Sequence, residues 1–236
     1  MQIIVPSTEG IHNTSPETLS RLERAKSYQD LSTIIISPIV GDLNPIVVQS
    51  WMGLMRPMNQ KVFGPIFIKG FEVGEAYNNG IQMILDHPEL SKFKYLCTIE
   101  HDNLPPPDGL LKLYESIENF DVVGGLYWTK GEDGQPMIYG NPLELPKNFI
   151  PQKPIPDCVQ PANGLGMGFN LFKLDMFKKM KGGWFKTLQE YDPNTGARAY
   201  TQDLYFYENA AKEGYKFACD TRVKVGHLDT STNIIW

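Results

Sequence analysis

The sequence predicts an α/β fold: a mostly parallel central sheet flanked by helices, with a small antiparallel part in its second half. Short apolar runs, of the kind that buried parallel strands need, alternate three times with helix-like segments over residues 32–128. Residues 129–161 then change character, with many turn-forming prolines and glycines and no sustained period. No internal repeat divides the 236 residues, so we expect one domain over 1–236.

The first half supplies the strand and helix alternations. Each expected strand is a short apolar run that a proline, a glycine or a polar cluster ends, and each expected helix has an apolar face. The strands are expected at residues 33–37, 65–69, 95–99 and 121–127, and the helices at 45–55, 75–85 and 109–118. A short strand in QIIVP and a helix over residues 15–28, capped by Ser15, are expected before them.

The second half is less regular. Residues 129–161 are expected to be loop and short strand forming a wall of a binding cleft, because long irregular connections in compact domains are often binding loops. The remaining expectations are a glycine-rich strand at 164–172, a helix at 174–180, a loop at 181–199, a helix at 201–213, and strands at 217–219 and 223–225.

Charge and composition exclude several function classes. The formal net charge is -5 and no lysine or arginine run is long, which argues against nucleic acid as a partner. No apolar stretch reaches the ~20 residues of a membrane span, and the first residues lack the pattern of a signal peptide, so a cytoplasmic protein is expected. Cys97, Cys158 and Cys219 have no metal or redox spacing, and the first and last are expected to be small buried hydrophobes.

Two carboxylates follow the buried strand at residues 95–99. Glu100 and Asp102 are one residue apart, so in an extended segment both point to one side. Hard oxygen ligands at the carboxyl end of a strand suit Mg²⁺ or Mn²⁺, which the phosphates of a nucleotide would also hold. Taken alone, the triplet also fits a solvated turn. His101 lies between the two and should point away from them.

Two more residues are candidates near the end of the chain. Asp203 falls in the first turn of an expected helix, where it either complements the helix dipole or takes a proton from a hydroxyl group. His227 ends a β-branched strand, where an imidazole is either an ordinary polar residue or a metal ligand. Aromatic residues beside the loops either stack on sugar rings or anchor the loops to the core, and they are Tyr127, Trp128, Tyr139 and Trp184.

Taken in order, these segments resemble a family 2-like glycosyltransferase of the GT-A fold, a Rossmann-like fold, over roughly residues 32–228. The resemblance rests on TIIISPIVGD, on AYNNG at 76–80, on EHDNLP at the place of the Asp-x-Asp metal motif, on DVVGG at 121–125, on GLGMGF at 164–169, on Gln202-Asp203, and on GYKFACD leading to His227. This sequence departs from the family at Glu100, Gln202 and Tyr77, where aspartate, glutamate and arginine are usual.

The resemblance implies a nucleotide-binding half at about 32–128, an acceptor-side half at about 129–236, and transfer of a sugar from a UDP- or GDP-linked donor to an acceptor hydroxyl, with a lean to inversion. It implies Mn²⁺ or Mg²⁺ held by Glu100, Asp102 and His227, and Asp203 as the catalytic residue. It further implies donor contacts from Pro38, Ile39, Val40, Lys69, Asn78, Glu100, His101 and Asp102, and acceptor-side contacts from Trp128, Gly166, Met167 and Gln202.

Two other functions remain open. A sugar-nucleotide pyrophosphorylase has a similar sheet but needs a glycine-rich, basic phosphate loop after its first strand, and residues 38–42 contain no lysine or arginine. A carbohydrate- or nucleotide-binding protein that has the fold without catalysis fits the replacements at Glu100 and Gln202. The presence of Asp102, Asp203 and His227 together favours the enzyme.

Overall fold

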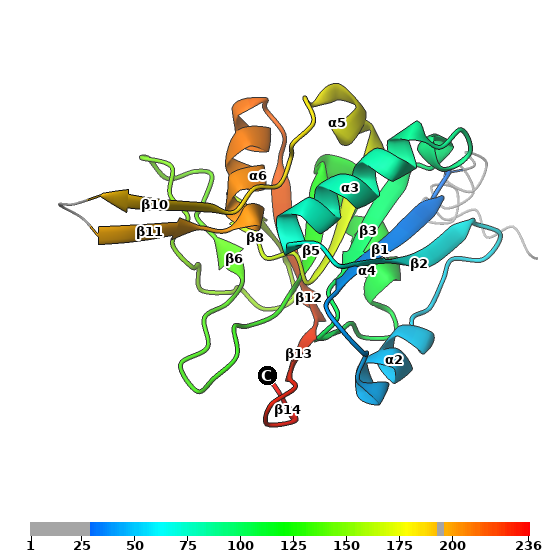
Figure 1. Cartoon of the computed structure of the whole chain (residues 1–236), viewed down its shortest axis with the longest axis horizontal. Helices are drawn as coiled ribbons and strands as arrows, with labels where there is room; N and C mark the ends of the chain where they lie inside the picture. Colours follow the sequence, from blue (N-terminus) through cyan, green and yellow to red (C-terminus); the bar gives the residue numbers. More distant parts are fainter. Residues whose placement is uncertain (1–28, 193–195) are drawn as a thin grey trace, which may run out of the picture. The chain divides into compact units, whose positions relative to one another are not determined.

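A seven-stranded sheet has the strand order β2-β1-β3-β9-β5-β12-β7 (Figure 1). The computed structural model describes residues 29–192 and 196–236, of which Leu31–Trp236 make one compact unit. Five strands run in one direction, and β9 and β7 run against them. The strands are β1 (Thr33–Ile39), β2 (Val62–Lys69), β3 (Tyr95–Ile99), β5 (Val122–Leu126), β7 (Val159–Ala162), β9 (Phe169–Lys173) and β12 (Phe217–Lys224).

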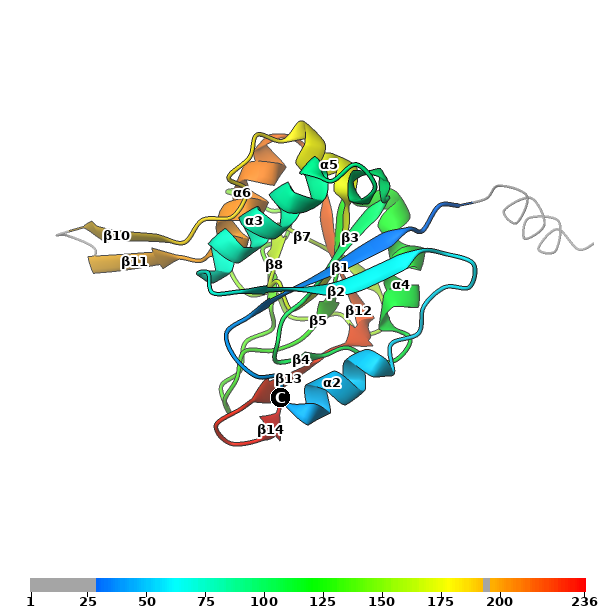
Figure 2. The ribbon, with the colours of Figure 1, turned by 45° about the vertical axis from the view of Figure 1, so that its right-hand side comes forward.

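Helices cover both faces of this sheet, as the turned view shows (Figure 2). Alternation along β1 explains the two layers: Ile34 and Ile36 join one apolar cluster and Ile35 joins the other. The first cluster receives α3 (Val73–Asp86), α5 (Leu174–Lys179) and α6 (Gln202–Lys212), and the second receives α4 (Gly109–Ser116). The expected mostly parallel α/β sheet with flanking helices is therefore confirmed.

Local sequence signals set the helix starts near the sheet edge. In α2 (Pro45–Met52), Pro45 takes the first position and the Asn44 side chain accepts from the Ile46 amide. In α3, the Glu72 carboxylate accepts from the amides of Gly74 and Glu75. Short 3₁₀ turns follow α3 and α4, at Leu90–Lys92 and Ile117–Asn119.

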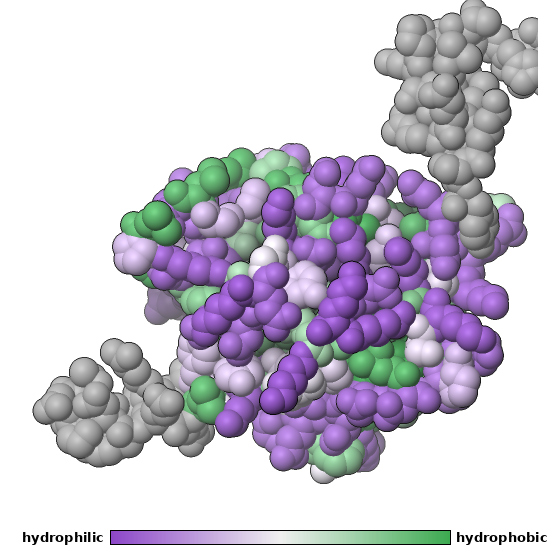
Figure 3. Space-filling model, turned by 90° about the horizontal axis from the view of Figure 1, so that it is seen from above, coloured by the Kyte–Doolittle hydropathy of each residue, from purple (hydrophilic) through white to green (hydrophobic). Residues whose placement is uncertain are grey.

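Hydrophilic residues dominate the face seen from above, where α3, α5 and α6 lie (Figure 3). This matches helices that turn their apolar sides toward the sheet. The buried members of the first cluster on α6 are Phe206, Tyr207 and Ala210. Among the described residues no helix has the length and apolar character that crossing a bilayer requires.

The small antiparallel parts are also present. β4 (Asn103–Leu104), β13 (Gly226–Asp229) and β14 (Ile234–Ile235) form one three-stranded sheet, and β6 (Ile138–Tyr139) pairs with β8 (Gly164–Leu165). Apart from β6 and the start of β7, the stretch 129–161 is irregular, as expected.

Three expectations about the second half need correction. The glycine-rich strand is broken into β8 and β9, because the Tyr127 hydroxyl approaches the backbone there: it accepts from Gly168 N at 3.0 Å, and a Cβ on Gly166 would lie 2.1 Å from it. The expected loop 181–199 contains a hairpin of β10 (Leu188–Asp192) and β11 (Gly196–Tyr200). The two terminal strands are one strand, β12, with a register shift between Asp220 and Lys224.

The N-terminal strand and the helix expected at residues 15–28 lie outside the described residues.

Candidate active site

Backbone pairing brings the end of β3 against the C-terminal strands. The amide of Asn103 donates to Glu100 O, which closes a turn after β3, and Asn103 then pairs with His227 across β4 and β13. Leu228 N donates to the carbonyl of Asp102 at 2.8 Å. Asp102 and His227, 125 positions apart in sequence, are therefore held side by side at the edge where the parallel strands end.

The side chains of Asp102 and His227 face each other. His227 Nε2 lies 3.4 Å from Asp102 Oδ2, and His227 Nδ1 lies 2.7 Å from the carbonyl oxygen of Trp128. Because a carbonyl only accepts, Nδ1 carries a proton, and Nε2 is left facing the carboxylate. A carboxylate and a ring nitrogen that face each other at this distance favour a positive charge between them, either a proton on Nε2 or a cation.

This pair suits a hard divalent cation. Neighbouring ligands of an octahedral ion, each at about 2.1 Å, lie about 3 Å apart. Mg²⁺ is usually bound through one or two protein carboxylates, with water and substrate phosphates completing the shell. Within residues 29–192 and 196–236, no group of three His, Cys, Asp or Glu side chains is arranged to hold a metal. The expected metal set of Glu100, Asp102 and His227 is therefore not brought together in this part of the chain. Asp102 and His227 are the two of its members whose side chains face each other.

A lysine that the sequence analysis did not single out also contacts Asp102. Lys130 Nζ lies 2.6 Å from Oδ2, the same oxygen that faces His227. Burial raises the pKa of Asp102, but the contacts from His227 and Lys130 outweigh burial and hold the pKa well below its usual range. Asp102 is thus ionised at neutral pH. No local pattern around Lys130 predicts the contact, because it depends on how residues 129–137 fold back.

Glu100 is directed to a different partner. Its Oε1 accepts a hydrogen bond of 3.1 Å from the hydroxyl of Tyr77 on α3. Burial, and then the charges of Asp102 and Asp203, raise the pKa of Glu100 to about 7, against the opposing effects of Tyr77 and His227. Glu100 is therefore within electrostatic range of Asp102, which also follows β3, and of Asp203 on α6.

Asp203 is buried at the start of α6, with 5% of its surface exposed. Burial raises the pKa of Asp203, while hydrogen bonds from Thr201 and the amide of Leu204 work against the increase. Its charge also raises the pKa of Tyr77, Tyr127 and Tyr139, behind the larger effect of burial. The charge of Asp203 thus acts on Glu100, although the two are 103 positions apart in sequence.

The other expected donor-binding and acceptor-side residues differ in how far they are buried. Val40 and Lys69 are exposed at the ends of β1 and β2, next to a buried Pro38 and a half-buried Ile39. The side chain of Asn78 makes two hydrogen bonds with the backbone of Phe185: its Nδ2 donates to Phe185 O at 2.7 Å, and its Oδ1 accepts from Phe185 N at 3.0 Å.

Nearer the carboxylates, Met167 is buried, His101 and Gln202 are half-buried, and Trp128 contributes its carbonyl to His227. Trp184 belongs to the core, where it packs edge-on against Phe177. The contacts that these residues make with a donor or an acceptor stay predictions.

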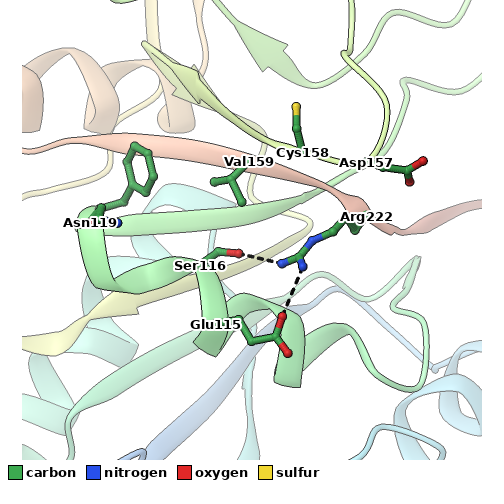
Figure 4. A pocket seen from close by; sticks show the side chains of 8 residues that line it. Glu115, Ser116, Asn119, Asp157, Cys158, Val159 and Arg222 are labelled. Atoms are coloured by element: carbon green, nitrogen blue, oxygen red, sulfur yellow. Dashed lines mark hydrogen bonds and ion pairs between the residues drawn. The ribbon is translucent and has the colours of Figure 1, made fainter. Parts of the chain in front are cut away.

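A pocket of about 390 Å³ between α4 and β12 has a different character (Figure 4). Its cation, Arg222, is engaged by its own neighbours: Nε and Nη2 donate to Asp220, Nη2 also donates to Ser116 Oγ, and Nη1 lies 3.2 Å from Glu115. Arg222 is therefore engaged by contacts within the fold.

Comparison with known proteins supports the fold. No family model and no curated protein matches the sequence. A crystal structure of A197 from STIV matches with a TM-score of 0.61 and 17% identity, over 86% of this chain and 92% of that one. A crystal structure of GalNAc-T7 with UDP, GalNAc and Mn²⁺ matches with a TM-score of 0.55 and 11% identity, over 86% of this chain. The fold is GT-A-like. The match spans 45% of the GalNAc-T7 chain, and at these identities the likeness concerns the fold alone.

Proposed function

We propose that this protein is a metal-dependent glycosyltransferase that moves a sugar from a UDP- or GDP-linked donor to an acceptor hydroxyl. The observation that carries the proposal is the Asp102 and His227 pair, with Nε2 facing a carboxylate oxygen at 3.4 Å at the edge where the parallel strands end. In open α/β sheets this edge is where ligands bind. The GT-A-like neighbour that was crystallised with UDP and Mn²⁺ supports a nucleotide and a metal in this fold.

Each residue then has a role. Asp102 and His227 would hold Mn²⁺ or Mg²⁺, which supplies Lewis-acid stabilisation of the departing diphosphate. Asp203 accepts the proton of the acceptor hydroxyl, whose oxygen forms a bond to the anomeric carbon as the bond from that carbon to the diphosphate oxygen breaks. The raised pKa of Asp203 brings this carboxylate closer to the range of an effective base. Attack from the face opposite the leaving group gives inversion, the outcome we favour.

The test is donor turnover. Purified protein is incubated with a panel of UDP- and GDP-sugars, with Mn²⁺ or with EDTA, and free nucleotide is measured. We expect metal-dependent release from one donor, because a transferase also passes sugar to water at a low rate. Asp102→Asn should lower the rate by about 100-fold or more, since loss of the ion removes several kcal/mol of charge stabilisation. Asp203→Asn should lower transfer by about 10²–10⁴-fold.

Asp108→Asn is the matched control, because Asp108 is a surface carboxylate paired with Lys112 at 2.7 Å. Its rate should equal that of the wild type. Equal rates in Mn²⁺ and EDTA, or an Asp102→Asn variant as active as the control, would contradict the proposal.

A binding protein without turnover is the second candidate. It is favoured by the contact between Lys130 and Asp102, which places a positive charge where the ion would act. Binding of nucleotide with no release from any donor in the panel would support this candidate over the enzyme.

A further inference from the structure

One oxygen of Asp102 serves two partners that compete with a metal ion. Oδ2 accepts from Lys130 Nζ at 2.6 Å and faces His227 Nε2 at 3.4 Å. Oδ2 is the oxygen that faces His227, so a divalent ion held between Asp102 and His227 would compete with Lys130 for it. Because an ammonium group and a divalent ion repel each other strongly at such short range, the two do not occupy the site together.

The backbone that carries Lys130 is anchored while its side chain has room to move. Thr129 N donates to Gln135 O, and Gly134 N donates to Gly131 O, so residues 129–135 form a tight surface turn. Trp128, two positions before Lys130, is tied to His227 through its carbonyl. The Lys130 side chain itself is one-third exposed. A lysine displaced from Asp102 therefore stays within a side-chain length of the same site.

We infer that Lys130 is the resident cation of Asp102 in the donor-free protein, that the metal ion displaces it, and that the released ammonium group binds the diphosphate of the donor. The inference rests on the proposed function and assigns a role to a residue outside the expected site. A divalent ion that is also held by the Asp102 carboxylate has one net positive charge left for the two negative charges of the donor diphosphate, and lysine is a common point-charge ligand of phosphate. The same side chain thus opposes the metal before the donor arrives and assists the donor afterwards.

This exchange predicts effects of opposite sign from one substitution. Lys130→Met keeps most of the side-chain length and removes the charge. In the absence of nucleotide, the variant should bind Mn²⁺ about tenfold more tightly than the wild type, a factor typical of coupling between two ligands. With saturating Mn²⁺ present, where the wild-type lysine is released from Asp102, the variant should bind UDP or GDP about tenfold more weakly than the wild type. Free Mn²⁺ is followed by electron paramagnetic resonance, and UDP and GDP binding by calorimetry.

Two further variants make the comparison specific. Lys130→Arg keeps the charge and should stay close to the wild type in both measurements. Lys153→Met removes a charge from an exposed loop position and should change neither affinity. Circular dichroism melts of all variants show whether each retains the fold, which a surface turn position should allow.

The outcomes separate the two proposals. Opposite shifts in Lys130→Met, absent in Lys130→Arg and Lys153→Met, support the inference. An unchanged or weaker affinity for Mn²⁺, or an unchanged affinity for both diphosphates, overturns it even if the wild type binds metal and nucleotide. If neither the wild type nor any variant binds Mn²⁺, UDP or GDP, the proposed function fails and the inference fails with it.

Discussion

Replacing Asp220 by asparagine should destabilise the protein by about 2–3 kcal/mol at pH 7. The side chain of Asp220 is fully buried, and each of its oxygens accepts two hydrogen bonds. Oδ1 accepts from the amide and Nε of Arg222, at 3.1 and 2.9 Å, and Oδ2 accepts from Ser116 Oγ and Arg222 Nη2, both at 2.7 Å. An asparagine amino group replaces one of these oxygens and faces two donors.

Two charge-assisted hydrogen bonds are then lost, each with a contribution of about 1.5–3 kcal/mol. The two lost hydrogen bonds together would cost about 3–6 kcal/mol. We expect a net loss of about 2–3 kcal/mol, because the Ser116 hydroxyl can rotate to another acceptor and Arg222, which is one-third exposed, can form hydrogen bonds with water instead. The assay is urea unfolding of the wild type and Asp220→Asn, with Asp133→Asn as an exposed control.

The pH dependence of this difference has a defined sign. Burial raises the pKa of Asp220, but the hydrogen bonds from Arg222 and Ser116 outweigh burial and lower the pKa below its usual value. A carboxylate with a depressed pKa contributes fully to the free energy of unfolding above its unfolded-state pKa of about 3.9. This contribution is lost as the pH falls through the folded-state pKa. The difference in unfolding free energy between wild type and variant should therefore be full at pH 7 and smaller near pH 3. A difference that is equal at both pH values, or no larger than that of the control, would refute this explanation.

Two further predictions concern the core. Phe206→Ala should lower the free energy of unfolding, measured by urea denaturation, by about 3–5 kcal/mol. Phe206 is fully buried and stacks on Phe185, with 4.7 Å between the ring centroids. A loss below about 1 kcal/mol would contradict this packing. Of the three free thiols, Cys158 should react first with a thiol reagent under native conditions, since burial raises the pKa of Cys97 and Cys219. Equal reaction rates for all three thiols would contradict the burial of Cys97 and Cys219.

Local sequence was sufficient for much of the sheet. The strand at 95–99 has the bounds that its apolar run predicts, because Glu100 and the prolines after it end the run abruptly. Cys97 and Cys219 are fully buried, as their apolar surroundings predict. The strand at 164–172 was predicted whole because nothing in its glycines shows that the Tyr127 hydroxyl, some 40 positions away, interrupts it.

The candidate site was predictable only where residues follow a strand or start a helix. Asp102 and His227 follow strands, and Asp203 lies in the first turn of a helix. A parallel sheet brings the carboxyl ends of its strands to one edge. Lys130 has no such marker, because its contact with Asp102 depends on the path of a loop. Trp184 had two interpretations from sequence, and the structure supports core packing over sugar stacking because the residue is 5% exposed.

The most direct test of the site is the magnetic signature of bound Mn²⁺. With Mn²⁺ and UDP or GDP added to the protein, pulsed electron paramagnetic resonance should show coupling to one imidazole nitrogen and to phosphorus of the nucleotide. The nitrogen coupling should disappear in His227→Gln, while it persists in His87→Gln, whose ring caps a surface turn. Mn²⁺ that binds with nucleotide but without coupling to nitrogen, or with coupling that survives in His227→Gln, would contradict a metal site built on Asp102 and His227.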